Sequence, residues 1–128
     1  MPLDDFLGAV SGPVRQRGVG VIAAGVYNSG ILADPVAAPF FDYHPASPEQ
    51  VDRALRMAAA CDAAGVPLAV AAARYPLRVA GVEAVVVGAR TPDEVDVFAD
   101  AADAPVPDHL WAELGLPAAP VPNRRLTP

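Results

Sequence analysis

Lysine is absent from this sequence of 128 residues, so all nine basic residues are arginine. The chain also holds one cysteine, Cys61, and two histidines, His44 and His109. A single cysteine cannot form a disulfide within the chain, which fits a reducing compartment and predicts a cytoplasmic protein. The two histidines have no further ligand at a recognisable metal-binding spacing, so no metal site is predicted.

Positive charge is also in short supply, because 15 acidic residues outnumber the nine arginines and give a net charge of −6. Such a surface repels phosphate backbones and anionic bilayers, so neither nucleic acid nor membrane is expected as a partner. No apolar run has the length of a membrane span, and Asp4 and Asp5 stand where a signal peptide carries positive charge. With 53% hydrophobic and 19% charged residues, the chain is expected to fold as one domain or against a partner.

Two short β-branched runs, at residues 18–26 and 81–87, predict strands. In both runs the apolar residues are continuous instead of alternating, which is typical of parallel strands covered on both faces. Residues 27–30 predict a turn. Residues 34–45 contain three prolines and an aromatic cluster and predict an ordered loop without regular structure.

Helix starts are clearest at Ser47 and Thr91, because each is followed by a proline and, three residues later, by Gln50 or Glu94. The full order of expected elements is helix 3–14, strand 18–26, helix 47–64, helix 67–75, strand 81–87, a helix from 91 and a last helix 108–114. This alternation predicts right-handed crossovers in a parallel α/β sheet. Two strands leave unpaired edges, so another chain or another copy is expected to complete the sheet.

Four segments, taken in order, resemble the aldo-keto reductases: GVGVIAAGVYNSGIL at 18–32, FDY at 41–43, GVPLA at 65–69 and VVVGARTP at 85–92. Within that family they are similar to the D-threo-aldose 1-dehydrogenase and L-fucose dehydrogenase branch. The resemblance implies a partial (β/α)8 TIM barrel over residues 1–116, the C-terminal portion with about two parallel strands and four to five helices. A full barrel needs about 250 residues. Residues 117–128 are expected to form a proline-rich, flexible tail.

The resemblance also implies a nicotinamide dinucleotide site where the two strands end. Its pyrophosphate and nicotinamide side falls on the first loop, at Gly25, Tyr27, Asn28 and Ser29, and its adenosine side falls on the second, at Gly88, Ala89, Arg90 and Glu94. Residue chemistry supports the second group, because a helix start, a glycine and an arginine favour an anion. Without the resemblance, the same second segment is sufficient as a turn and a helix cap.

The identity of the cofactor rests on two departures from the family pattern. Members that prefer the 2′-phosphorylated cofactor carry basic residues at the positions of Gly88 and Glu94, so the resemblance implies NAD, with NADP disfavoured. A carboxylate at position 94 would repel a phosphate and accept a hydrogen bond from a free ribose hydroxyl. Phe98 stands where the family places an asparagine against the adenine, which leaves that contact without its usual residue.

Catalysis in the family uses a tyrosine, a lysine, an aspartate and a histidine from the first half of the barrel. We therefore expect no catalytic residue in this chain and no turnover by it alone, since an unperturbed tyrosine titrates near 10 and needs a neighbouring cation. Two readings stay open. In one, the chain binds the cofactor for hydride transfer at C1 of an aldose, with a lysine-bearing half barrel or a second copy as partner. In the other, it is a non-enzymatic remnant or a self-associating module.

Other residues with reactive side chains are expected to have structural roles. Cys61 and Trp111 are expected to pack in the interior. Residues 42–44 are expected to form a solvated loop, and Ser29 is expected to serve a turn or a phosphate because it lacks the flanking pattern of a nucleophile. The substrate and the oligomeric state are not determined by these observations.

Overall fold

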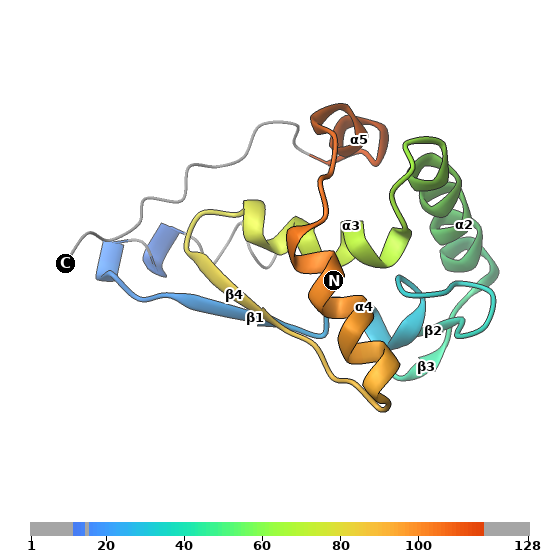
Figure 1. Ribbon diagram of the computed structural model, residues 1–128, viewed down its shortest axis with the longest axis horizontal. Coiled ribbons are helices and arrows are strands. Elements are labelled where there is room, and N and C mark those ends of the chain that lie inside the picture. The colour runs from blue at the N-terminus through green and yellow to red at the C-terminus, as the bar shows by residue number, and fades with distance from the viewer. Residues whose placement is uncertain (1–11, 15, 117–128) are drawn as a thin grey trace.

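The computed structural model describes residues 12–14 and 16–116 and shows an α/β chain (Figure 1). Strands β1 (Val21–Ala24) and β4 (Val82–Val86) form a parallel pair, and β2 (Phe40–Phe41) and β3 (His44–Pro45) form an antiparallel one. The α-helices are α2 (Pro48–Ala63), α3 (Leu68–Arg74), α4 (Pro92–Asp103) and α5 (Asp108–Glu113), and the 3-10 helices are η1 (Asn28–Gly30) and η2 (Tyr75–Arg78). The predicted α/β class, the two parallel strands and the order of the predicted elements within the described residues are confirmed. The expected helix 3–14 and tail 117–128 lie outside the described residues, except that residues 12–14 are helical.

Helix α2 begins and ends where the sequence indicates. The Ser47 hydroxyl accepts a hydrogen bond from the Gln50 backbone N–H at 3.3 Å, and the Gln50 side chain accepts one from the Ser47 N–H at 2.8 Å. This reciprocal pair is the predicted capping box. At the other end Gly65 takes a left-handed φ of 70°, and the Val66 N–H turns back to the Cys61 carbonyl at 2.9 Å.

The interior of the helical part is a cluster of side chains shared by α2, α3, α4 and α5. Its buried members, here called the helix cluster, are Cys61, Val66, Leu68, Val70, Ala71, Ala101, Leu110, Trp111 and Leu114. The Tyr75 ring lies 5.9 Å from the Trp111 ring, and the Arg78 guanidinium lies over the same indole at 4.7 Å. The packing roles predicted for Cys61 and Trp111 are therefore confirmed. Burial, and then the neighbouring Asp62, raise the pKa of the Cys61 thiol.

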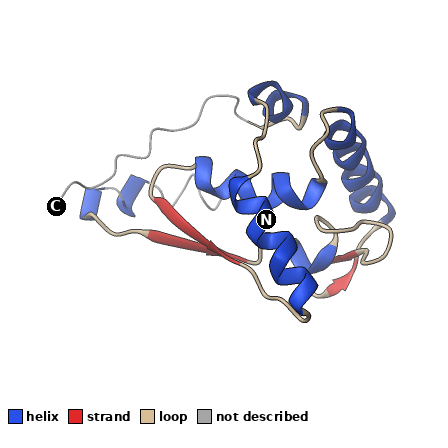
Figure 2. Cartoon of the chain, in the orientation of Figure 1, coloured by secondary structure: helices blue, strands red, loops and turns tan. Residues whose placement is uncertain are grey.

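The β1–β4 sheet, here called the strand pair, is covered on one face. Ala23 and Val82 are buried beneath residues of η2 and the segment that follows it. The open face is formed by Ile22, Ala24, Ala84 and Val86, because an irregularity in the register places Ala84, and not Glu83, opposite Ile22. Ile22 is 65% exposed and Val86 is 55% exposed. Helices gather to one side of the two strands (Figure 2), and the described residues supply no layer for the other face.

Continuous apolar runs are typical of parallel strands covered on both faces, and the described residues cover only one face of the strand pair, as expected of two strands that need another chain or copy to complete the sheet. The apolar pattern records what the strands are suited to contact, whereas the described elements reach only one face. Neither strand has a second hydrogen-bonded neighbour among residues 12–14 and 16–116. The expectation of unpaired sheet edges is confirmed for that part of the chain.

The loop expected at residues 34–45 contains a small hairpin, so the prediction of no regular structure there is wrong. Phe40 pairs with Pro45 and Phe41 pairs with His44. Strands of two residues are too short to produce a readable alternation. Within the described part of the chain, no single helix is long and apolar enough to cross a membrane, and α2 with the segment Leu68–Arg78 meets that test only as a pair bent by 97°.

Candidate functional site

The two loops predicted to hold a dinucleotide leave the same edge of the sheet. Because β1 and β4 run parallel, residues 25–29 and 88–94 both follow carboxyl ends of strands. The Tyr27 ring, just after β1, stacks on the Phe98 ring of α4 with centroids 5.4 Å apart and planes inclined by 24°. This contact joins the first loop to the helix that begins at the second. The structure therefore brings the two predicted groups of residues to one edge.

The loop after β1 bends through left-handed backbone. Gly25 has a φ of 67°, and its carbonyl accepts a hydrogen bond from the Asn28 N–H at 2.9 Å. Asn28 and Ser29 also have positive φ values, of 49° and 68°. Non-glycine residues pay about 1–3 kcal/mol each for sparsely populated conformations, which persist when surrounding contacts enforce them.

Those contacts come from the β2–β3 turn. The Asn28 side-chain oxygen accepts a hydrogen bond from the Asp42 N–H at 3.4 Å, and the Ser29 hydroxyl accepts one from the Tyr43 N–H at 2.8 Å. Asp42 and Tyr43 are themselves left-handed, with φ values of 49° and 64°. The two predicted cofactor residues thus hold the turn with their acceptor atoms. Their donors, an amide NH₂ and a hydroxyl hydrogen, are the groups suited to phosphate oxygens.

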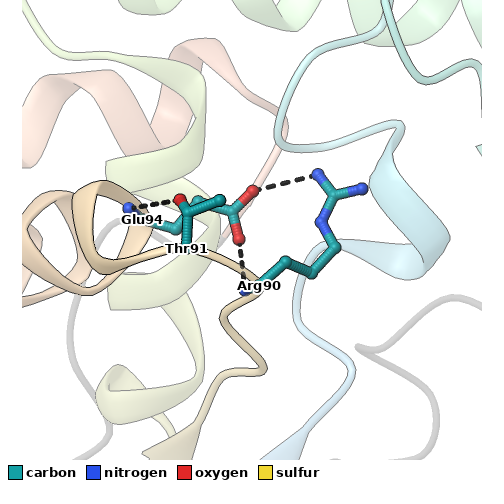
Figure 3. Close-up of polar contacts among 3 residues, drawn as sticks. All are labelled: Arg90, Thr91 and Glu94. Carbon is teal, nitrogen blue, oxygen red and sulfur yellow. Dashed lines mark hydrogen bonds and ion pairs between the residues drawn. The ribbon is translucent and has the colours of Figure 1, made fainter.

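The loop after β4 ends in a capped helix (Figure 3). The Thr91 hydroxyl accepts a hydrogen bond from the Glu94 N–H at 3.3 Å, as the predicted helix start requires. The Glu94 carboxylate turns back toward Arg90: one oxygen accepts from the Arg90 N–H at 2.6 Å and the other accepts from the guanidinium at 2.9 Å. The Arg90 backbone bond, and then its guanidinium, lower the pKa of the Glu94 carboxyl.

In the loop after β4, the Glu94 carboxylate thus occupies part of the hydrogen-bonding capacity of Arg90. Arg90 has a side chain that is 89% exposed, so part of its guanidinium still faces solvent. An open cleft of about 490 Å³ lies here, lined by Ala89, Arg90, Thr91, Pro92, Val95 and Asp96. Asp96 and Glu94 make its surroundings acidic. The cleft therefore suits a ligand that donates hydrogen bonds through hydroxyl groups more than one that brings a further dianionic phosphate.

The two predicted glycines differ in what the chain requires of them. Gly25 takes a left-handed φ, whereas Gly88 does not. A Cβ added at either position would meet no atom of the described residues within 4 Å. Gly88 therefore has no steric reason within the chain to be glycine, and the space above it is open to a ligand.

Tyr27, predicted to lie on the pyrophosphate and nicotinamide side of the site, follows β1 at the shared edge and packs by its ring. Its hydroxyl is buried without a hydrogen-bond partner among the described residues, and burial raises the pKa of Tyr27. The Tyr27 ring, and not its hydroxyl, makes the contact described above, the stack on Phe98. Sequence reasoning missed this contact because nothing in the spacing of the two aromatic residues links them. Phe98, which lacks the amide of the family pattern, thereby has a packing role.

Residues 42–44 are solvent-exposed, as expected of a solvated turn. Across residues 12–14 and 16–116, no group of three or more histidine, cysteine, aspartate or glutamate side chains is placed to hold a metal ion. The chemistry available at the edge is therefore hydrogen bonding and charge, from Asn28, Ser29, Arg90 and Glu94.

Comparison with known proteins gives two relatives. The chain is 38% identical over 101 residues to a pyridoxal 4-dehydrogenase of Microbacterium luteolum, a match that covers 78% of this chain and 30% of that enzyme. It is 40% identical over 101 residues to a D-threo-aldose 1-dehydrogenase of Pseudomonas sp., covering 77% of this chain and 31% of that enzyme. No protein-family model matches the chain. The chain thus spans less than a third of the length of these two curated relatives.

Proposed function

Because the chain is related in sequence to aldo-keto reductase-type dehydrogenases, we propose that it supplies the dinucleotide-binding edge of an oxidoreductase barrel. In this proposal β1 and β4 are neighbouring strands of a partial (β/α)8 barrel, and the residues after each strand hold the cofactor. The reaction it serves is hydride transfer between C1 of an aldose and a nicotinamide ring. The sugar itself is left open, since one relative acts on an aldose and the other on pyridoxal by name.

The observation that carries this proposal is the shared edge of the two loops. Ligands of parallel α/β sheets bind outside the carboxyl ends of the strands, where loops from neighbouring strands converge. The stack of Tyr27 on Phe98 gives that edge a fixed geometry within this chain. Asn28 and Ser29 offer donors from the first loop, and Arg90 offers a guanidinium from the second.

We propose NAD as the cofactor, in preference to NADP. Glu94 is held beside Arg90 by two hydrogen bonds and neutralises the charge that a 2′-phosphate would need. A free ribose hydroxyl instead finds a carboxylate able to accept its proton in a hydrogen bond. Asp96 lines the same cleft, and its negative charge also disfavours the 2′-phosphate of NADP.

Turnover requires a second component in this proposal. The chain has no lysine, and the family's tyrosine, lysine, aspartate and histidine belong to a part of the barrel outside the segment resembled. The partner we propose is a lysine-bearing half barrel, in the cytoplasm, that pairs with the free edges of the strand pair. Sustained oxidation of L-fucose with NAD by the purified chain alone would contradict this division of labour.

Calorimetric titration with NADH and NADPH tests the cofactor proposal. We expect saturable heat for NADH and weaker binding of NADPH. Glu94→Gln should improve NADPH binding several-fold, because it removes a like charge. Glu113→Gln, which changes an exposed carboxylate on α5, is the matched control and should change neither affinity. Absence of saturable NADH heat at millimolar concentration would refute the proposal.

A non-enzymatic, self-associating module is the second candidate, favoured by the open face. Ile22 and Val86 expose apolar surface beside unpaired strand edges, a combination that promotes association between copies. Sedimentation velocity of the wild type and of Ile22→Glu distinguishes the two. A stable dimer that Ile22→Glu dissociates, together with no response to NADH, would favour the module over the oxidoreductase part.

A further inference from the structure

A second hollow lies among the helices, away from the acidic cleft at Arg90. It encloses about 380 Å³ between α2, α3, α5 and the segment that follows β1. Most of its lining is apolar, with Met57, Leu68, Tyr75 and Trp111 among the larger side chains. Cavities of this size, with apolar walls and a few polar groups, are the size class that encloses small-molecule ligands.

One polar atom of this region has no partner. The Trp111 indole Nε1–H is buried and makes no hydrogen bond among the described residues, although Trp111 lines the cavity and is only 2% exposed. Buried indole N–H groups are ordinarily paired, and an unpaired buried donor costs about 1–3 kcal/mol. Because this nitrogen is itself shielded from solvent, the apolar part of the Trp111 side chain is what lines the cavity.

The mouth of the cavity carries a positive charge. Arg53 lines the cavity while staying exposed to solvent, which places it at the opening. No ion pair or hydrogen bond of Arg53 forms within the described residues. Arg56, one turn further along α2, is paired with Asp52 and does not line the cavity. Among the described residues, the arginine without a partner, Arg53, therefore lies at the cavity, and the paired Arg56 lies outside it.

We propose that this cavity binds a small aromatic acid, with its ring among the helices and its anionic group on Arg53. The apolar walls match a flat ring system, and Arg53 matches a carboxylate or sulfonate. In a chain of net charge −6, Arg53, which has no carboxylate partner among the described residues, is a selective attraction for an anion. Asn28, from the loop after β1, also lines this cavity, but the acidic cleft at Arg90 shares none of its lining residues, so the anion site at Arg53 is separate from the second loop.

A pair of fluorescent probes tests the proposal. 8-Anilinonaphthalene-1-sulfonate is an aromatic anion, and N-phenyl-1-naphthylamine has the same ring system without the sulfonate. Trp111 is the only tryptophan, so energy transfer from it reports a probe bound beside it. We expect saturable transfer to both probes at one site per chain. Arg53→Gln should weaken the sulfonate about five- to tenfold and leave the neutral probe unchanged.

Matched variants locate the site. Arg56→Gln should change neither probe, since that arginine lies outside the cavity. Ala72→Leu fills the cavity and should abolish transfer to both probes, with circular dichroism to check the fold. Ile22→Glu, on the open face, should leave both unchanged. The proposal would be overturned if Arg53→Gln weakened binding of both probes equally, if Ile22→Glu weakened binding of either probe, or if no saturable energy transfer occurred. If Ala72→Leu does not fold, the comparison of Arg53→Gln with Arg56→Gln still decides the proposal.

Discussion

The helix cluster and the strand pair are both apolar, but they differ in how much of that surface the chain itself covers. In the helix cluster, Leu110 and Cys61 are fully buried and Trp111 is 2% exposed. In the strand pair, Val82 is 1% exposed while Val86, on the opposite face, is 55% exposed. Helices satisfy their backbone hydrogen bonds internally and need only one packed stripe, whereas strands of a parallel sheet bond to neighbouring strands and are ordinarily covered on both faces.

The difference teaches where this chain depends on other protein. The helix cluster is closed by α2, α3, α4 and α5, all elements of this chain, so it is stabilised within the chain. The strand pair carries both predicted cofactor loops, yet its open face and free edges are unfilled by the described residues. The part that we propose binds a dinucleotide is therefore also the part most in need of a partner.

The largest expected contrast between the two regions is in stability. Leu110→Ala should lower the free energy of unfolding by about 2–5 kcal/mol, because it leaves a cavity in the helix cluster. Ile22→Ala, on the open face, should lower it by less than about 0.5 kcal/mol. Urea denaturation followed by Trp111 fluorescence measures both. Equal losses would show that Ile22 is covered and that the contrast is false.

A second, smaller contrast lies within the strand pair. Val82→Ala should cost about 1.6 kcal/mol, from two buried methylene equivalents, whereas Val86→Ala should cost much less. The same denaturation assay applies. If a lysine-bearing partner that completes the sheet is then added, the cost of Val86→Ala should rise toward that of Val82→Ala. If the loss of unfolding free energy in Val86→Ala stays small in the complex, the partner does not cover the open face.

The smallest expected effect concerns pH at the second loop. The folded state lowers the pKa of Glu94 below its unfolded value, so its contribution to stability is complete above the unfolded pKa and is lost as the pH falls through the folded one. Carbon-13 NMR titration should show a depressed carboxyl pKa. Arg90→Gln should raise it only in part, because the backbone N–H of residue 90 remains. An unchanged Glu94 pKa in Arg90→Gln would show that the guanidinium does not lower it.

Much of the fold could be predicted because its signals are local. The Ser47 capping box, the Thr91 cap and the Gly65 stop each depend on residues within one helical turn, and each is present. The two strands were readable from continuous β-branched runs. Coverage of the open face was not, because the apolar pattern of a strand does not state which chain supplies the cover.

The structure brings the residues of the candidate site to one edge of the sheet, but their contacts could not be predicted from the sequence. The family resemblance indicated Asn28, Ser29, Arg90 and Glu94. It did not indicate that Asn28 and Ser29 hold the β2–β3 turn, nor that Glu94 closes on Arg90. The first two contacts join segments distant in sequence, and the third was hidden because the same residues also read as an ordinary helix cap. The cavity beside Trp111 had no sequence signal, since it depends on how three helices pack.

Native-state hydrogen exchange with and without NADH tests the central claim most directly. The claim is that the two loops at the carboxyl edge of the strand pair act as one dinucleotide site, while the helix cluster is independent of it. NADH at millimolar concentration should slow amide exchange in residues 25–29 and 88–94 together and leave α2 and α5 unchanged. No slowing in either loop, or slowing confined to one of them, would contradict the account.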